Sequence, residues 1–239
     1  MERKKLENVT LLGIDCIDIS RLILAADICQ KYFDFGSVKL LTSLESNDSN
    51  IVKINPIIST EEYSRFIIAE LEKYVDTEYV LIFQYDGFIL NPEKWTDEFL
   101  KYDYVGAPWL TADWSVKNFG FPKELLGKFI VGNGGFSLRS KKFTSLCSRL
   151  AKENIFSNYH PEDVVLCVHS RKLLESNGIK FAPVNIAKQF SFEGEDDESI
   201  AWDGQFGFHG LQWTDISKWL EKNPEYYFDK KNNIIVLGK

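Results

Sequence analysis

Gln84 and Asp86 are residues whose types and spacing could do chemistry, and they follow a continuous apolar run over residues 79–83. An apolar run of this length, bounded by turn residues, predicts a strand that is buried on both faces of a sheet. A carboxylate just past such a strand lies at the carboxyl edge of the sheet, where open α/β folds bind their ligands. Asp86 could bind a divalent cation there, with Gln84 as a neutral ligand or hydrogen-bonding partner, although Asp also ends many strands simply as a turn residue.

Two further places carry groups that could move a proton or bind a metal. Glu162 and Asp163 follow Pro161, so both are expected in the first turn of a helix, where either could act as a general base. The helix dipole favours carboxylates there for stability alone and lowers their pKa, so a base would need burial or a neighbouring carboxylate to raise it. His209 stands in a glycine-rich turn and is either a metal ligand or a hydrogen-bonded turn residue.

A third motif, residues 131–140, joins four turn-type residues at 132–135 to the start of a strand. Glycine adopts backbone conformations closed to other residues and lets a ligand approach the main chain, so Gly134 and Gly135 are expected to line the floor of a pocket. A tight turn before a strand is the alternative. The spacing is neither GxGxxG nor GxxxxGK[ST], which argues against a nicotinamide-binding fingerprint and against a P-loop.

The elements that must position these groups alternate along the chain. Strands are expected over residues 9–14, 38–41 and 79–83. The first strand ends near Asp15, and helices beginning at Ser20 and after the capping-box residue Ser59 separate the three strands. This alternation predicts an α/β fold, one domain over residues 1–239, with a central, mostly parallel sheet flanked by helices. Later segments are expected as a loop-rich excursion (109–127), a helix (141–151), an acidic surface loop (194–199) and a terminal strand (234–237).

Composition limits the function classes that fit. The 239 residues carry a formal net charge of -7, and the basic cluster of Arg139, Lys141 and Lys142 is small, so no nucleic-acid partner is expected. Without a basic patch, a ligand that carries phosphate would need a divalent metal to neutralise it. The four cysteines form no CxxC pair, which predicts free thiols, and no 18-residue apolar run occurs, so no transmembrane segment is expected. We expect a cytoplasmic protein, with any membrane contact peripheral at the inner face.

In their order along the chain these motifs resemble a known family. The motifs are Gln-x-Asp-Gly, Asp-Tyr-x-Gly-Ala-Pro-Trp, Gly-Asn-Gly-Gly-Phe-Ser-Leu-Arg, Pro-Glu-Asp and Phe-Gly-Phe-His-Gly. Together they resemble the bacterial and fungal glycosyltransferase-like family labelled domain of unknown function 5672 (DUF5672). That family in turn resembles the GT-A class of nucleotide-sugar glycosyltransferases, which carry a DxD motif, a glycine-rich segment, a later catalytic acid and often a late histidine ligand.

The resemblance implies a role for individual residues. Asp86 matches the second, metal-binding acid of DxD, whereas Gln84 stands where the first acid would be and so departs from the GT-A pattern. Asp163, with Glu162 as second choice, matches the base of inverting enzymes, and His209 matches the late metal ligand. We also expect Asp15, Gly134 and Gly135 to contact the donor. Arg65 is expected either to reach the donor phosphates or to be a solvated surface residue. Because two protein ligands are few for a hard cation, the donor diphosphate is expected to complete the shell, with Mn²⁺ favoured over Mg²⁺.

The resemblance therefore implies a metal-dependent transfer of a sugar from a nucleoside-diphosphate sugar to a hydroxyl of a carbohydrate acceptor. Trp109, Trp114 and Trp202 could stack on acceptor sugars or belong to the core. Two other interpretations stay open. One is a nucleotide-sugar pyrophosphatase or nucleotidyltransferase on a similar sheet, and the other is a non-catalytic protein that binds a carbohydrate or nucleotide sugar on a degenerate transferase fold.

Overall fold

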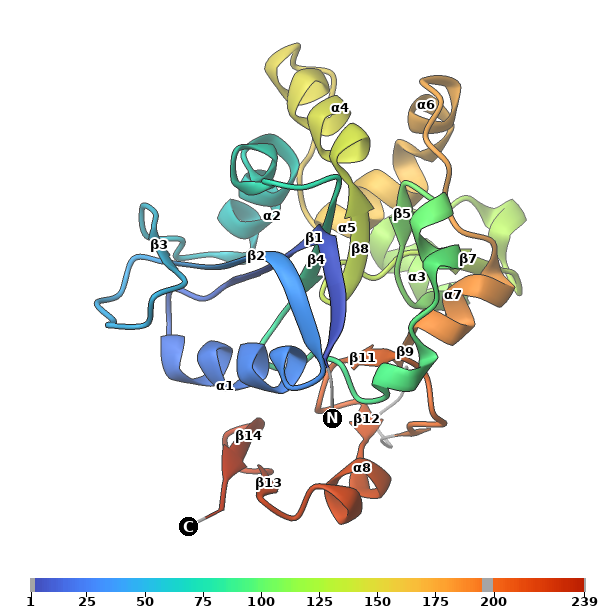
Figure 1. Ribbon diagram of the computed structural model, residues 1–239. Coiled ribbons are helices and arrows are strands. Elements are labelled where there is room, and N and C mark those ends of the chain that lie inside the picture. Colours follow the sequence, from blue (N-terminus) through green and yellow to red (C-terminus); the bar gives the residue numbers. More distant parts are fainter. Residues whose placement is uncertain (1–2, 195–199, 239) are drawn as a thin grey trace.

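A six-stranded sheet in the order β3-β2-β1-β4-β8-β5 forms the centre of the computed structural model, which describes residues 3–194 and 200–238 (Figure 1). The strands are β1 (Lys4–Ile14), β2 (Phe33–Thr42), β3 (Ile51–Lys53), β4 (Tyr79–Phe83), β5 (Tyr104–Val105) and β8 (Ser137–Ser140). Strands β3, β2, β1 and β4 pair in parallel, and β8 pairs antiparallel with β4 and β5. The expected α/β fold with a mostly parallel central sheet is confirmed.

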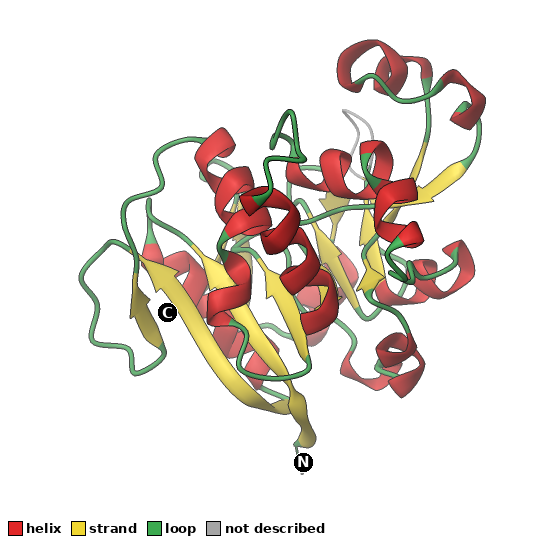
Figure 2. Cartoon of the chain, turned by 90° about the horizontal axis from the view of Figure 1, so that it is seen from above, coloured by secondary structure: helices red, strands yellow, loops and turns green. Residues whose placement is uncertain are grey.

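Helices cover both faces of this sheet (Figure 2). Helix α1 (Ile19–Gln30) lies on one face, and α2 (Thr60–Ala69) and α4 (Lys141–Lys152) lie on the other (Figure 1). Side chains of β4 alternate between the two cores: Leu81 and Phe83 pack with residues of α1, and Val80 and Ile82 pack with residues of α2. All four are at most 1% exposed, so β4 is buried on both faces, as the apolar run predicted.

Local signals place most elements correctly and a few wrongly. Ser59 caps α2 by accepting a hydrogen bond from the backbone N–H of Glu62, as the capping-box spacing predicted. The cap of α1 is Asp18 and not Ser20, because the Asp18 side chain accepts the bond from the Ser20 N–H. Strand β2 begins at Phe33, five residues before the expected strand over residues 38–41, and β3 was not predicted.

The second half of the chain is built from short elements. The loop-rich excursion contains β6 (Pro108–Leu110), α3 (Asp113–Phe119) and β7 (Phe129–Val131), and β6 pairs antiparallel with β7. The remaining helices are α5 (Glu162–Val164), α6 (Arg171–Ser176), α7 (Val184–Phe190) and α8 (Ser217–Lys222), with a π-helical turn at Val165–His169. The 3₁₀ turns are Leu71–Tyr74, Pro92–Lys94, Asp97–Lys101 and Lys123–Leu125. The remaining strands are β9 (Ser191–Glu193), β10 (Ile200–Ala201), β11 (Gly207–His209), β12 (Thr214–Asp215), β13 (Tyr226–Asp229) and β14 (Ile234–Leu237).

Further sequence-based expectations concern the cysteines, the terminal strand and the acidic loop. All four cysteines are free, as expected, and Cys29, Cys147 and Cys167 are buried. The terminal strand is confirmed as β14, which packs against α1. The expected acidic surface loop lies outside the described residues except for Gly194. In the part of the chain that is described, no helix has the length and apolar character needed to cross a bilayer.

Candidate functional site

Strands β1 and β4 lie side by side at the centre of the sheet, and their carboxyl ends form one edge of the candidate site. The sheet runs from β1 to β2 and β3 on one side and to β4 on the other, so the strand order reverses between β1 and β4. Open α/β folds bind ligands in the crevice outside such a reversal. Asp15 follows β1 at this edge, and Gln84 and Asp86 follow β4.

Asp15 is buried and already has partners within the chain. Its Oδ1 accepts hydrogen bonds from the backbone N–H groups of Ile17 (2.8 Å) and Asp18 (3.0 Å), and its Oδ2 accepts one from Nε of Arg21 (2.6 Å). The guanidinium of Arg21 in turn lies 3.6 Å from the centre of the Tyr85 ring. Asp15 therefore organises the turn between β1 and α1, and its contact with a donor stays a prediction.

Gln84, Asp86 and His209 turn polar atoms toward one another. Gln84 and Gly87 exchange two backbone hydrogen bonds of 3.1 Å, which closes a tight turn with Asp86 inside it. Nε2 of His209 lies 3.1 Å from Oε1 of Gln84 and 3.8 Å from Oδ1 of Asp86. Oδ1 of Asp86 is buried without a hydrogen-bond partner in the described part of the chain. The fold thus brings together side chains from two motifs that are far apart in the sequence.

Glu193 holds the other ring nitrogen of His209. The two residues are Cα partners in the parallel pair of β9 and β11, and Nδ1 lies 2.8 Å from Oε1 of Glu193 and 3.0 Å from Nδ2 of Asn133. Burial lowers the pKa of His209, but the charge of Asp86 and the hydrogen bond and charge of Glu193 outweigh it and raise the pKa to about 9. Without a bound metal ion, His209 is therefore an imidazolium between two carboxylates at neutral pH.

These groups fit a divalent cation that replaces the proton on Nε2 of His209. The 3.8 Å between Nε2 and Oδ1 of Asp86 allows both atoms to share one ion, since such metal bonds are about 2.0–2.2 Å long. A carboxylate on Nδ1, here Glu193, is the contact that commonly orients metal-binding histidines. Among the described residues no three His, Cys, Asp or Glu side chains form a metal site, so further oxygen ligands would come from Gln84 and a phosphate-bearing ligand.

The glycine-rich segment packs against side chains of the site itself. A Cβ atom on Gly135 would lie 2.1 Å from Nε2 of His209, and one on Gly134 would lie 2.0 Å from Oε1 of Glu162. In this segment the left-handed backbone belongs to Asn133, with φ of 52°, and not to a glycine. The two glycines are needed because functional side chains fill the space of a Cβ atom, and their contact with a donor stays a prediction.

Gly135→Ala is expected to destabilise the protein by about 1–3 kcal/mol, the usual cost of overpacking, and to displace His209 from Asp86. Urea unfolding measures the stability, and the NMR signals of the His209 imidazole report the displacement. Gly238→Ala is the matched control, because its Cβ atom would meet its nearest neighbour at 3.4 Å. Equal stability of the two variants would contradict the close packing of His209 on Gly135.

Glu162 and Asp163 begin α5 but differ in their partners. Oε1 of Glu162 accepts a 2.7 Å hydrogen bond from Nη2 of Arg139, and Oε2 accepts one from the backbone N–H of Asp163. This ion pair is buried, with 1% of the Arg139 side chain and 8% of the Glu162 side chain exposed. Within the described residues, the oxygens of Asp163 accept only backbone bonds, from Gly134 (3.0 Å) and Val164 (2.8 Å). Asp163 is the better candidate for proton transfer, because Glu162 is already engaged in an ion pair with Arg139.

The surroundings of Asp163 favour its protonated form. Burial has the largest effect and the charge of Glu162 adds to it, so the pKa of Asp163 is raised to about 7 despite the hydrogen bond from Gly134. Burial and a neighbouring carboxylate are the two effects that were expected to raise the pKa of a first-turn carboxylate enough for it to act as a base. With this pKa, Asp163 can accept a proton and is still ionised in a large share of molecules at pH 7.

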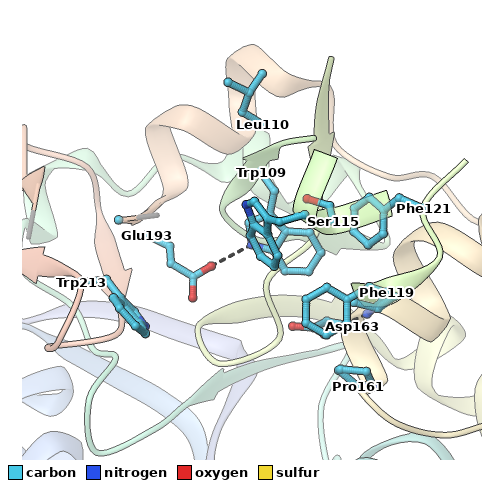
Figure 3. Close-up of a pocket in the computed structure, with 12 residues that line it drawn as sticks. Trp109, Leu110, Ser115, Phe119, Phe121, Pro161, Asp163, Glu193 and Trp213 are labelled. Atoms are coloured by element: carbon cyan, nitrogen blue, oxygen red, sulfur yellow. Dashed lines mark hydrogen bonds between the residues drawn. The ribbon is translucent and has the colours of Figure 1, made fainter. Parts of the chain in front are cut away.

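Asp163 and Glu193 line a cavity of about 470 Å³ whose wall is otherwise mainly aromatic and apolar (Figure 3). The lining residues are Trp109, Leu110, Trp114, Ser115, Phe119, Phe121, Pro161, Asp163, Val164, Glu193, Gly194 and Trp213. Nε1 of Trp109 donates a 2.7 Å hydrogen bond to Oε2 of Glu193, the dashed line in Figure 3. Although burial raises it, the pKa of Glu193 is lowered by His209 and Trp109, so Glu193 is an acceptor at neutral pH. The cavity has the size and the few polar groups typical of a small-molecule site.

The structure separates the three tryptophans that were considered as platforms for sugars. Trp109 and Trp114 line the cavity, and Trp213, which was not predicted, lines it as well. Trp202 belongs to the core and is 7% exposed, with its Nε1 donating to the backbone carbonyl of Gln205. Of the two roles left open for Trp202, the structure supports the core role.

Arg65 is not brought to the group around His209. Its guanidinium lies 4.8 Å from the centre of the Tyr159 ring, on the exposed side of α2, and its contact with a donor phosphate stays a prediction. The α2 residue that does reach the site is Tyr63, whose hydroxyl accepts a 2.9 Å hydrogen bond from Nε2 of Gln84. Tyr63 therefore fixes the amide of Gln84 so that its oxygen faces His209.

Besides Trp213, sequence reasoning missed Glu193, Arg139 and Tyr63 as site residues. Glu193 stands beside an acidic segment, and no motif distinguishes it from its neighbours. Tyr63 belongs to the helix expected after Ser59, and none of the motifs includes it. Arg139 did carry a signal, because a charged residue within an apolar strand pattern must find a buried partner, and the nearest motif with unpaired acids contains Glu162.

Comparisons with known proteins bear on the family and the fold. Residues 48–209 match a family described as Protein of unknown function (DUF5672). No curated protein matches the chain.

Three solved structures resemble the chain at low sequence identity. The galactosyltransferase LgtC, in complex with donor and acceptor sugar analogues, is 18% identical over 77% of this chain and 75% of that one, with a TM-score of 0.47. The mannosyltransferase PcManGT from Pyrobaculum calidifontis, in complex with GDP-Man and Mn²⁺, is 12% identical over 75% of this chain and 55% of that one (TM-score 0.42). The bifunctional IspDF from Campylobacter jejuni is 10% identical over 73% and 48% (TM-score 0.39), so the chain spans about half the length of the last two. At these scores none of the three decides the function.

Proposed function

The chain belongs to the DUF5672 family, and we propose that it is a metal-dependent glycosyltransferase. The donor would be a nucleoside-diphosphate sugar, and the acceptor would be a hydroxyl group of a carbohydrate. The observation that carries the proposal is an aromatic cavity in which Asp163, with a pKa of about 7, lies across from Glu193, the partner of His209. A base beside a sugar-sized aromatic cavity, next to a site suited to a cation, is what glycosyl transfer requires.

The edge of the sheet supplies the donor side of this site. Asp86, His209 and Gln84 would hold Mn²⁺ or Mg²⁺ together with oxygens of the donor diphosphate. The bound cation would offset the negative charge that develops on the leaving diphosphate. Glu193 orients His209 for this role by its hydrogen bond with Nδ1. The absence of a side chain on Gly135 leaves room for the imidazole ring.

The cavity supplies the acceptor side. Each oxygen of Asp163 accepts one backbone hydrogen bond and keeps a second lone pair, so the carboxylate can accept the proton of an acceptor hydroxyl. The hydroxyl oxygen then forms a bond to the anomeric carbon of the donor as the bond to the diphosphate breaks, with inversion at that carbon. Trp109, Trp114 and Trp213 offer ring faces on which the acceptor sugar can stack.

A thermal-shift experiment tests the donor side. At about 100-fold excess over Kd, one nucleoside-diphosphate sugar is expected to raise Tm by roughly 5–10 °C in the presence of Mn²⁺. The shift should be much smaller without Mn²⁺ and in the Asp86→Asn variant, because the diphosphate then loses its link to the protein. Mn²⁺ alone should change Tm little, since most of its ligands would come from the donor. A donor-induced shift of equal size with and without the metal would contradict metal-dependent binding.

A further inference from the structure

Glu193 makes one strong hydrogen bond to each side of the site. Its Oε1 accepts a 2.8 Å bond from Nδ1 of His209, and its Oε2 accepts a 2.7 Å bond from Nε1 of Trp109. His209 ends β11 and faces Asp86, whereas Trp109 lies in β6 and lines the cavity. One carboxylate therefore joins a ring of the cation site to a ring of the cavity wall.

Backbone packing and Glu193 act on both rings, and His209 also contacts Asn133 and Gln84. A Cβ atom on Gly135 would lie 2.1 Å from the His209 ring, and one on Gly132 would lie 2.2 Å from the Trp109 ring. The main chain thus blocks each ring on one side, and the hydrogen bond to Glu193 fixes its rotation on the other. With 16% of its side chain exposed, Glu193 has little room to move without both rings.

We propose that Glu193 is a positioning residue that couples occupation of the cation site to the placement of Trp109 in the cavity. The proposal rests on the proposed function, because it takes the cation and diphosphate to bind beside Nε2 of His209. With the cation site occupied, the imidazole of His209 would be held toward Asp86, and the carboxylate of Glu193 would follow Nδ1. Trp109 then moves with the second oxygen, so the acceptor wall is set when the donor is in place.

The variant Glu193→Gln separates the two bonds. An ionised carboxylate can accept from both rings, whereas an amide offers one acceptor oxygen and one N–H donor group. If the amide oxygen faces His209, its NH₂ group faces the Trp109 N–H, and the indole loses its bond. If the oxygen faces Trp109, the amide NH₂ group faces Nδ1 of His209, which must then be an unprotonated acceptor, so the remaining ring proton stays on Nε2, where the cation would bind. Either arrangement breaks the link between the two rings.

Two side-chain NMR signals of the full chain test the link without measuring activity. The indole N–H of Trp109, assigned by its loss in Trp109→Phe, reports the cavity wall, and the side-chain amide of Gln84, assigned in Gln84→Ala, reports the cation site. The probes are Mg²⁺ with uridine, guanosine, cytidine or adenosine diphosphate. In the parent protein both signals are expected to shift with the same midpoint. In Glu193→Gln, the Trp109 signal should no longer follow, or both responses should be lost.

Three outcomes are distinguished by these signals. A shift of Gln84 without a shift of Trp109 in the parent overturns the coupling but leaves the proposed function intact. Unchanged responses of both signals in Glu193→Gln overturn the coupling as well. No shift of Gln84 with any of the diphosphates overturns the proposed donor site itself. Glu124→Gln is the matched control and should behave like the parent, because Glu124 is an exposed carboxylate in the loop-rich excursion (109–127) that also contains Trp109.

Discussion

Asp163→Asn is expected to lower kcat by about 10²–10⁴-fold while the donor still binds, because the amide cannot accept the proton of the acceptor hydroxyl. The substitution keeps the size of the side chain and an oxygen that can accept a backbone hydrogen bond. Steady-state kinetics measures the loss, and the thermal shift with donor and Mn²⁺ shows that the donor site survives. Asp113→Asn, an exposed carboxylate in the first turn of α3, is the control and should keep full activity. Near-normal turnover of Asp163→Asn would remove Asp163 from the role of base.

The pH dependence of the parent protein follows from the same residue. Asp163 must be ionised to act as a base, and burial together with the charge of Glu162 raises its pKa to about 7. Activity, measured as kcat/KM, should therefore fall about tenfold for each pH unit below 7, a limb that Asp163→Asn should lack.

Stability should show the opposite dependence on pH. The pKa of Asp163 is higher in the folded state than its unfolded value of about 3.9, so the folded state binds the proton more tightly. The stability from this proton is present below pH 4 and is lost as the pH rises to about 7. Asp163→Asn removes that loss, so its Tm relative to the parent should be higher at pH 8 than at pH 5.

Arg139→Met is expected to destabilise the fold by about 3–5 kcal/mol, the usual cost of leaving one partner of a buried ion pair alone. Arg139 lies in β8 and is 1% exposed, and its Nη2 donates to Oε1 of Glu162 at 2.7 Å. Without the guanidinium, the Glu162 carboxylate is buried beside Asp163 with no positive charge to balance it. Urea unfolding of both proteins at pH 7 gives the difference.

Arg149→Met is the matched control for this prediction. Arg149 also pairs with a glutamate, Glu153 at 3.2 Å, but both side chains are about half exposed. Exposed pairs of this kind contribute about 0–1 kcal/mol, so the control should lose little stability. A similar loss in both variants would mean that burial of the Arg139 pair does not govern its contribution to the fold.

Local sequence signals were enough to predict the centre of the fold. The apolar run at residues 79–83 gave β4 with both faces buried, and the spacing of Ser59 and Glu62 gave the cap of α2. The early parts of β1 and β2 were missed because they include polar, exposed residues, and only pairing with a neighbouring strand makes them extended. These parts of β1 and β2 are extended because they pair with neighbouring strands, and not because of their own residue types.

The types of the residues were enough to predict part of the candidate site. Which residues contact one another depends on how the strands pair. Asp86 and His209 stood out as a carboxylate and an imidazole in turns, and their approach to 3.8 Å depends on β11 lying beside the turn after β4. Glu193 contacts His209 because β9 pairs with β11, and no local sequence pattern predicts that pairing. The sequence predicted that Gly135 lines a pocket floor. In the structure the His209 imidazole occupies the space that a Cβ atom of residue 135 would need.

The nucleotide product formed from a nucleotide sugar tests the central claim most directly. The chain is incubated with a panel of nucleoside-diphosphate sugars, with and without Mn²⁺, and the released nucleotide is identified by chromatography. A glycosyltransferase with water as a poor acceptor should release nucleoside diphosphate slowly, only with the metal, and more slowly still in Asp163→Asn. Release of nucleoside monophosphate would instead indicate a pyrophosphatase or nucleotidyltransferase, and no turnover of any donor would indicate a binding protein; either result would contradict glycosyl transfer.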